Sequence, residues 1–353
     1  MNKSFVSNQS NTVPQLPSAA LPYLPERETM KRTIHRRRQA HLPTNPKSIQ
    51  DLGEIPREFK VTLSNKNFVC YDSYFDDEDE EEDDDEARRR RILVFASKSG
   101  LKKLAESPVL YVDGTFETAP TIFAQVVTIH GEYRKEALPF AYALLPDQNQ
   151  ETYVRMFNGV FNECEEYDIP RPAPTTWIMD LEKALNNAAH EVAEDAELRL
   201  CLFHLRQAAI RKISELGLQT AFRDPDDDSV RTAYRQIVGT AFVPTEDVVN
   251  AFLEARRAMP ARMNAFADYF ETTYTMARRQ RENRRATAPR YPPKTWNQYL
   301  AARENMARTN NATEGWHNRF DVRVQWRTKL LAHLLFSKCF YRLRVCTIVP
   351  YIS

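Results

Sequence analysis

The sequence predicts an α/β fold built on a mixed β-sheet, and two observations carry this prediction. Apolar, β-rich runs follow one another between residues 92 and 145, and after residue 150 such runs alternate with segments of helical periodicity. Consecutive strands joined by short turns pair antiparallel, whereas strands joined by crossover helices pair parallel. The sheet is therefore expected to contain both kinds of pairing and to carry helices on both faces.

Short runs rich in Val, Ile, Leu and aromatic residues mark the expected strands. Two of them end directly before an aspartate: the run 109–112 precedes Asp113, and the run 176–179 precedes Asp180. Counted from residue 109, the expected order is β-β-β-α-β-α-β-α. The expected strands are 59–63, 67–71, 92–95, 109–112, 121–130, 137–145, 176–179 and 198–205.

Helices are expected where apolar residues recur every three or four positions. Tyr153, Met156, Phe157 and Val160 follow this spacing. From His204 onward strand signals are sparse, so a large α-helical insertion is expected at about 206–305, before the last helix of the core. The expected helices are 99–107, 152–167, 181–193, 207–215, 229–240, 245–258 and 263–274.

This order of elements is the ribonuclease H-like (RNase H-like) arrangement. In it, acids at the ends of the first and fourth strands face each other across neighbouring strands, so Asp113 and Asp180 are expected to meet. A third acid, Glu314, is expected on a later helix packed against the sheet. Three carboxylates from distant parts of a chain are the minimum set for holding two Mg²⁺ or Mn²⁺ ions, which prefer anionic oxygen ligands.

Each acid also has an ordinary structural interpretation. Asp113 with Gly114 could form a hairpin turn, and Asp180 could only be the N-cap of a helix from residue 181. Glu314 could pair with Asn311 in a variant of the capping box. The coincidence of three acids with the order of the elements favours the metal site.

Composition and charge indicate a folded protein with a polyanionic partner. The chain has 353 residues and 42% hydrophobic residues, enough for one large or two modest domains. Residues 76–86 are all acidic, and the formal net charge of +1 becomes +12 once these eleven negative charges are set aside. Long blocks of like charge are normally solvated, so the remainder is a basic protein suited to a polyanion such as DNA.

The five cysteines are an odd number and lie far apart, so no disulfide framework is expected. No charged start followed by an apolar stretch opens the chain. No apolar run reaches the roughly 18 residues of a membrane span. The expected location is a reduced compartment, nuclear in a eukaryotic cell and otherwise intracellular.

Four regions are expected along the chain. Residues 1–58 form a disordered N-terminal region with a basic cluster at 31–38, which suits phosphate contact, nuclear import or a solvated helix face. Residues 59–91 form a short β-like segment and an acidic linker. Residues 92–325 form the core with its insertion, and residues 326–353 form a C-terminal helix or a truncated tail.

Four separate motifs follow one another along the chain: Asp113-Gly114-Thr115-Phe116, Met179-Asp180-Leu181-Glu182-Lys183-Ala184, Cys201-Leu202-Phe203-His204, and Thr309-Asn310-Asn311 with Glu314-Gly315-Trp316-His317. In this order, over about residues 90–320, they resemble the motifs of the Mutator-like element (MULE) transposase domain. The resemblance implies an RNase H-like core of the DDE superfamily, with Asp113, Asp180 and Glu314 as the metal-binding triad. An N-terminal zinc module often found in such proteins has no counterpart, because Cys70 stands alone upstream of the core.

Cys201 and His204 match the Cys-x-x-His signature of that family. On the expected strand they would point to opposite faces, and no second pair completes a zinc site. Core packing is their ordinary interpretation, and contact near the site or with a DNA end is what the resemblance implies. The same role is expected for His317 beside Glu314, for Asn311, and for a basic stretch whose ordinary interpretation is an exposed charged loop. Its residues are Arg278, Arg279, Arg281, Arg284 and Arg285.

The resemblance implies a DNA transposase, or a transposase-derived protein, that cleaves DNA and transfers strands with Mg²⁺ or Mn²⁺. The alternative is a domesticated, non-catalytic DNA-binding or regulatory protein derived from a transposase. An RNA-cleaving ribonuclease H fits less well, because the large helical insertion suits transposases. The expected partner is DNA, as transposon ends and target, with homo-oligomer formation left open and no membrane or small-molecule substrate.

Overall fold

The computed structural model describes six ranges of the chain, 46–62, 64–75, 90–116, 119–134, 136–276 and 288–304, and seven residues before residue 37. The chain divides into two units, residues 1–44 and 45–353, and each is described by itself. In the first unit, the amide of Met30 donates to the carbonyl of Glu26 at 3.0 Å. The sheet, the helices after it and the candidate site all belong to the second unit.

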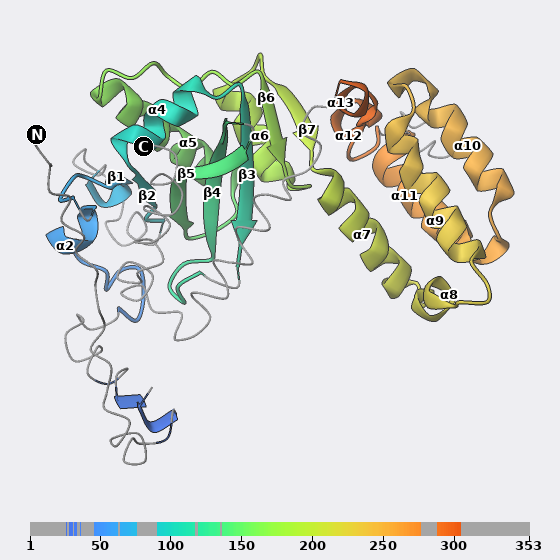
Figure 1. The fold of residues 1–353 in the computed structure, drawn as a ribbon, viewed down its shortest axis with the longest axis horizontal. Coiled ribbons are helices and arrows are strands. Elements are labelled where there is room, and N and C mark those ends of the chain that lie inside the picture. Colours follow the sequence, from blue (N-terminus) through green and yellow to red (C-terminus); the bar gives the residue numbers. More distant parts are fainter. Residues whose placement is uncertain are drawn as a thin grey trace, which may run out of the picture. The chain divides into compact units, whose positions relative to one another are not determined.

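The second unit contains a seven-stranded mixed sheet in the order β1-β2-β5-β4-β3-β6-β7 (Figure 1). Pairing is antiparallel from β1 through β3, and parallel between β3 and β6 and between β6 and β7. The expected α/β fold with a mixed sheet is therefore confirmed. The strands are β1 Val69–Asp72, β2 Leu93–Ala96, β3 Val109–Thr115, β4 Gln125–Tyr133, β5 Glu136–Leu145, β6 Thr176–Met179 and β7 Glu197–Leu200.

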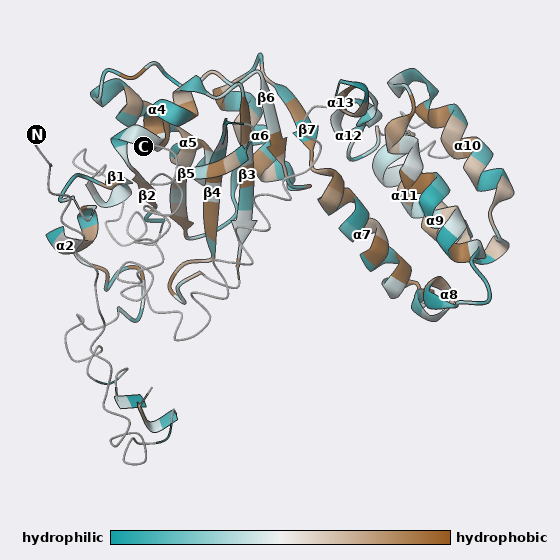
Figure 2. Ribbon diagram, viewed as in Figure 1, coloured by the Kyte–Doolittle hydropathy of each residue, from teal (hydrophilic) through white to brown (hydrophobic). Residues whose placement is uncertain are grey.

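Both faces of the sheet are buried, and the residues of β2 alternate between them. Val94 packs on the face covered by helices α4 (Lys98–Glu106), α5 (Gln150–Glu166) and α6 (Lys183–Val192). Phe95 packs on the opposite face with residues such as Phe68 and Tyr142. Figure 2 shows the hydrophobic residues gathered in the central strands.

Helix α5 follows the spacing read from the sequence. Tyr153, Met156, Phe157 and Val160 are all buried on one side of the helix. The ring of Phe157 lies 5.1 Å from that of Trp177 on β6, centroid to centroid. This apolar stripe fixes α5 across the sheet, which places Tyr153 near the ends of β4 and β6.

The helical region after β7 has its own hydrophobic core, which includes Phe252, Phe266, Phe270 and Trp296. The indole Nε1 of Trp296 donates to two backbone carbonyls at 2.9 and 3.1 Å, so the last short helices are fixed to this core. The helices expected at 229–240, 245–258 and 263–274 are confirmed as helical. The helices are α7 Leu202–Glu215, α8 Gln219–Arg223, α9 Ser229–Gly239, α10 Val248–Ala258, α11 Asn264–Phe270, α12 Pro293–Trp296 and α13 Tyr299–Arg303.

Two strand predictions are wrong. The expected strand 198–205 ends at Leu200, and α7 begins at Leu202, because Leu202, Leu205 and Ala209 have helical spacing and bury the same side of a helix. The expected strand 59–63 is largely replaced by the short helix α2 (Arg57–Lys60), leaving one isolated bridge from Val61.

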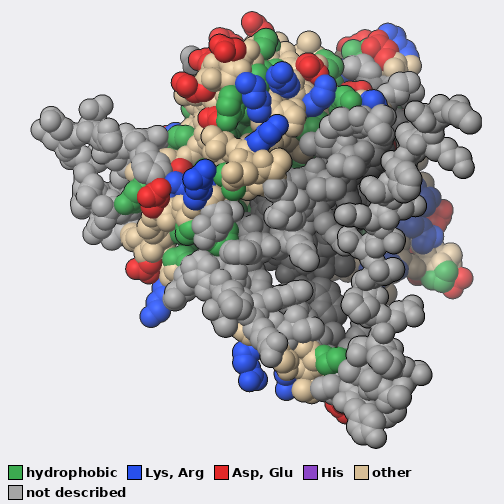
Figure 3. All heavy atoms as spheres, turned by 60° about the vertical axis from the view of Figure 1, so that its left-hand side comes forward, with side chains coloured by type: hydrophobic (Ala, Val, Ile, Leu, Met, Phe, Trp, Pro, Cys, Tyr) green, Lys and Arg blue, Asp and Glu red, His purple; other side chains and the backbone are tan. Residues whose placement is uncertain are grey.

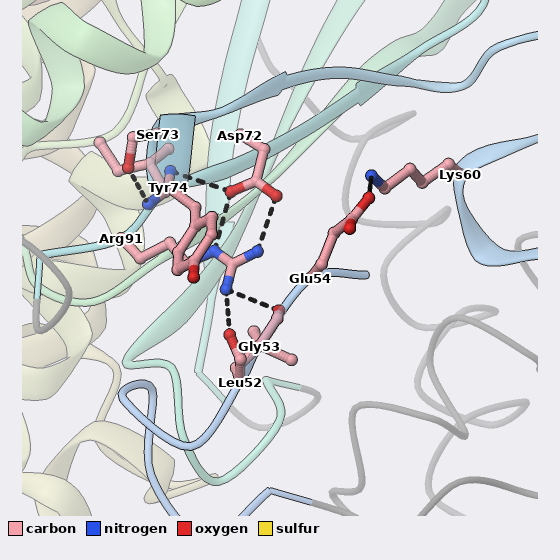
Figure 4. A network of polar contacts seen from close by, with 9 residues as sticks. Leu52, Gly53, Glu54, Lys60, Asp72, Ser73, Tyr74 and Arg91 are labelled. Atoms are coloured by element: carbon pink, nitrogen blue, oxygen red, sulfur yellow. Dashed lines mark hydrogen bonds and ion pairs between the residues drawn. The ribbon is translucent and has the colours of Figure 1, made fainter. Parts of the chain in front are cut away.

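A buried ion pair joins the first two strands of the sheet (Figure 4). The guanidinium of Arg91 donates to both carboxylate oxygens of Asp72, at 2.8 and 2.7 Å, and to the carbonyls of Leu52 and Gly53. Its charge also lies 4.6 Å from the ring centre of Tyr74. One side chain therefore fixes the segment before β1 and the end of β1 to the start of β2.

The described surface is mixed in charge on the face that Figure 3 shows, where Lys and Arg side chains are interspersed with Asp and Glu. The acidic run 76–86, the basic stretch 278–285 and residues 305–353 lie outside the described residues. Among the helices that the structure describes, none is both long and apolar enough to cross a bilayer.

Candidate active site at the ends of two parallel strands

Asp113 and Asp180 lie next to each other in the sheet. Strands β3 and β6 are parallel neighbours whose register pairs Val112 with Met179, so each aspartate follows directly on a paired residue. Adjacent strands lie about 4.8 Å apart, which brings the two carboxylates to the same edge. Asp113 is 4% exposed, and the side chain of Asp180 is 41% exposed. The expected meeting of the two aspartates is therefore seen in the structure.

The ordinary interpretations of these two aspartates are both wrong. Asp113 and Gly114 lie inside β3, paired with Thr128 and Val127 of β4, and therefore form no hairpin turn. Helix α6 begins at Lys183 with Glu182 in the N-cap position, so Asp180 lies before the helix and does not cap it. Asp113 therefore forms no hairpin turn and Asp180 no N-cap, although Oδ1 of Asp180 accepts a hydrogen bond from the amide of Leu181.

The imidazole of His204 lies between the two aspartates. Its Nδ1 is 3.5 Å from Oδ1 of Asp180, and its Nε2 is 4.0 Å from Oδ1 of Asp113. His204 is in the first turn of α7, which begins directly after β7 and points this residue back toward the neighbouring strand ends. Three residues far apart in the sequence therefore share one polar site.

The sequence-based argument from alternation placed Cys201 and His204 on one strand, but in the structure Cys201 lies between β7 and α7 and His204 lies on α7. Cys201 is fully buried with Tyr111 and Ile178, and its amide donates to the carbonyl of Met179 at 2.8 Å. His204, three residues later on α7, faces the aspartates instead. The core-packing interpretation therefore describes Cys201. The periodic Leu202, Leu205 and Ala209 were the sequence signal for this helix.

Sequence reasoning missed a network of hydrogen bonds beside these residues. The amide Nε2 of Gln125 donates to the hydroxyl of Tyr153 at 2.6 Å, and that hydroxyl donates to Oε1 of Glu182 at 2.7 Å. The side-chain amide Nε2 of Gln148 donates to the other carboxylate oxygen of Glu182, Oε2, at 3.2 Å. The only signal in the sequence was the position of Glu182, two residues after Asp180.

Burial shapes the electrostatics of this network. Desolvation raises the pKa of Glu182 above its ordinary value, the Tyr153 hydrogen bond partly offsets this, and the negative charge of Asp180 raises it further. Burial likewise raises the pKa of the Tyr153 hydroxyl, which therefore remains a hydrogen-bond donor at neutral pH. The site thus holds carboxylates close together, in a setting where a positive charge would be favourable.

The remaining predicted site residues lie outside the described residues. They are Glu314, Asn311, His317, Arg278, Arg279, Arg281, Arg284 and Arg285. Within the described ranges, no three His, Cys, Asp or Glu side chains form a metal-binding group. Asp113 and Asp180 nevertheless supply the oxygen donors that hard divalent cations prefer, so the residues present fit such an ion as a partial ligand set.

Comparison with known proteins agrees with this geometry. Residues 109–208 match the family model of the MULE transposase domain. The matched range contains Asp113, Asp180, Cys201 and His204. The chain finds no match among the curated proteins.

Proposed function

We propose that this chain is a DNA transposase, or a transposase-derived protein, that cleaves DNA and transfers strands with the help of Mg²⁺ or Mn²⁺. The match to a transposase domain implies DNA as the partner. The observation that carries the proposal is the meeting of Asp113, Asp180 and His204 at the ends of two parallel strands. These are residues that the matched domain spans and that the fold does not use as caps or turns.

The proposed fold is RNase H-like. The order β5-β4-β3-β6-β7, with only β4 running against the other four strands, supports this assignment, because it puts the first and fourth strands of the core side by side. The helices described between β7 and residue 304 support the insertion proposed at about 206–305. Glu314, on the segment after it, is the proposed third acid.

In this proposal Asp113, Asp180 and Glu314 would hold the metal ions. The chemistry that such ions would supply is polarisation of the phosphodiester and activation of the attacking hydroxyl. The protein's own contribution is to fix the carboxylates and to orient the DNA backbone, so catalysis rests on position and charge. His204, within 4.0 Å of both aspartates, is suited to contact a phosphate or to orient a carboxylate.

Exposed residues on α7 support DNA as the substrate. Arg206 and Arg211 are exposed and follow His204 along the helix, and Phe203 is 36% exposed beside it. Guanidinium groups contact backbone phosphates, and an exposed aromatic ring can stack on a base. We propose that DNA approaches the site along this helix.

A nicking assay on supercoiled DNA with Mg²⁺ or Mn²⁺ tests the proposal. The wild-type chain should cut only with metal, and Asp113→Asn and Asp180→Asn should each reduce the rate by about 100-fold or more. Asp195→Asn, at an exposed position between α6 and β7, is the matched control and should cut at the wild-type rate.

Other outcomes separate the alternatives. DNA binding by the wild type with no metal-dependent cutting would refute the enzymatic proposal and favour a domesticated regulatory protein. Preferred cleavage of an RNA–DNA hybrid over duplex DNA would point to a ribonuclease instead. Equal rates for Asp180→Asn and Asp195→Asn would show that the cutting activity does not come from this site.

A further inference from the structure

The backbone ladder between β3 and β6 stops one residue short of the two aspartates. The last registered pair is Val112 with Met179, and Asp113 and Asp180 lie just beyond it. Hydrogen bonds between the two strands therefore position the residues before the aspartates. Asp113 is still held by the ladder between β3 and β4, which continues to Thr115, whereas Asp180 lies beyond the end of β6. Contacts outside the sheet must therefore hold Asp180 relative to Asp113, because functional groups that act together need positions defined within about 0.5 Å.

The Gln125–Tyr153–Glu182 network begins beside Asp113. Gln125 and Tyr153 are each 1% exposed, so their hydrogen bonds are shielded from water. The amide oxygen of Gln125 abuts Gly114, the residue after Asp113, where a Cβ would come within 2.9 Å of that oxygen. The amide nitrogen of the same side chain also donates to the carbonyl of Asp147 at 3.1 Å. This end of the network therefore packs against β3 at Gly114 and is held in place by its hydrogen bond to Asp147.

The network ends beside Asp180. Glu182 receives one hydrogen bond on each carboxylate oxygen, from Tyr153 and from Gln148. Its backbone carbonyl accepts from the amide of Asn186 at 3.0 Å in the first turn of α6. Both the side chain and the backbone of Glu182 are therefore held, and the short turn from Asp180 to the start of α6 is held with them.

We propose that the Gln125–Tyr153–Glu182 network sets the spacing of Asp113 and Asp180 where the ladder between β3 and β6 ends, and that Tyr153 and Glu182 are positioning residues for the metal site. This inference rests on the proposed function and deepens it. The central hydroxyl of Tyr153 is the only atom that bonds both Gln125 and Glu182 within the network. Removing this hydroxyl disconnects Gln125 from Glu182 while leaving the aromatic ring of residue 153 packed in the core.

Binding of Mn²⁺ to the full chain, followed by electron paramagnetic resonance, tests this role directly. Loss of a partner that orients a metal-ligating residue typically weakens metal affinity by about 10–100-fold. We expect Tyr153→Phe and Glu182→Ala to weaken Mn²⁺ binding within this range. Glu182→Gln should recover most of the affinity lost in Glu182→Ala, because its amide oxygen still accepts from Tyr153.

Tyr274→Phe is the matched control, because Tyr274 is equally buried and its hydroxyl pairs with that of Tyr269 at 3.3 Å in the helical region. It should bind Mn²⁺ with wild-type affinity. An equal loss in Tyr274→Phe and Tyr153→Phe would overturn the inference, because any buried hydroxyl would then have the same effect. Wild-type affinity of Tyr153→Phe for Mn²⁺ would also overturn the inference.

Hydrogen exchange provides a readout that needs no metal. The amides of residues 114–116 and 181–183 should exchange faster in Tyr153→Phe than in the wild type, and unchanged rates would overturn the inference. If the wild type bound no Mn²⁺ and cut no DNA, the proposed function would fail, and the exchange rates would still decide whether the network positions the two aspartates.

Discussion

Removal of the Arg91 guanidinium should strongly destabilise the fold. The side chains of Arg91 and Asp72 are 1% and 5% exposed, and two hydrogen bonds join them. Arg91→Met preserves much of the apolar stem but leaves the Asp72 carboxylate buried without its counter-charge. Breaking a buried pair in this way costs about 3–5 kcal/mol, because the remaining charge keeps its desolvation penalty. We expect the free energy of unfolding to fall by that amount.

The neighbouring residue provides the control. Arg90 pairs with Glu151 at 2.8 Å, but these side chains are 38% and 63% exposed. An exposed pair contributes about 0–1 kcal/mol, so Arg90→Met should have little effect. Urea unfolding of both variants at pH 7 gives the comparison. A loss below about 1 kcal/mol for Arg91→Met, or equal losses in the two variants, would refute the reasoning.

The double variant Asp72→Leu/Arg91→Met separates the charge from the packing. Replacing a buried ion pair with apolar residues of similar size is often neutral or stabilising. The double variant should therefore be more stable than Arg91→Met alone. If it is less stable, the loss in Arg91→Met comes from packing and from the contacts to Leu52 and Gly53.

Two further predictions concern a glycine and a carboxylate. Gly159→Ala should lower the free energy of unfolding by about 1–2 kcal/mol despite the helix propensity of alanine, because the new Cβ would lie 2.5 Å from the ring of Tyr71. Gly239→Ala is the control, because no atom lies within 4 Å of the Cβ that it would add. In the same urea unfolding assay it should be neutral or stabilising. The pKa of the Asp227 carboxyl should be about 2 in the folded protein, since hydrogen bonds from Ser229 and Arg262 and the charge of Arg262 lower it. The ionised carboxylate therefore stabilises the folded state above pH 3.8, and this stabilisation is lost as the pH falls through 2. If the carboxyl chemical shift of Asp227 titrated near pH 4, this prediction would be wrong.

The sequence predicted the strands of the sheet well because each is a short local pattern. The runs 92–95, 109–112 and 176–179 match β2, β3 and β6 to within a few residues. The same local logic failed at 198–205, where a strand and a helix meet at Cys201 without a glycine or proline between them. The helical spacing of Leu202, Leu205 and Ala209 indicates the helix, but it overlaps the apolar run 198–205, and only the burial of these residues in the helical core decides where the strand ends.

The pairing of Asp113 and Asp180 was within reach of the sequence, since both end apolar runs and the order of elements makes their strands neighbours. The position of His204 could not be predicted, because it depends on helix α7, whose first residues were predicted to be part of a strand. Gln125, Tyr153 and Glu182 lie in separate elements, and none of them is part of a spacing that marks chemistry. Their hydrogen bonds exist only because α5 crosses the sheet at one particular position.

The sequence alone determined the alternation of apolar and polar residues, and with it the strands, most helices and the two aspartates at strand ends. These features follow from interactions between residues close together in the chain, where period and burial are linked. The tertiary structure alone decided that His204 faces both aspartates, that Tyr153 joins Gln125 to Glu182, and that Arg91 pairs with Asp72. Each of these contacts depends on register and packing angle, which are set by the whole core at once and by no single segment.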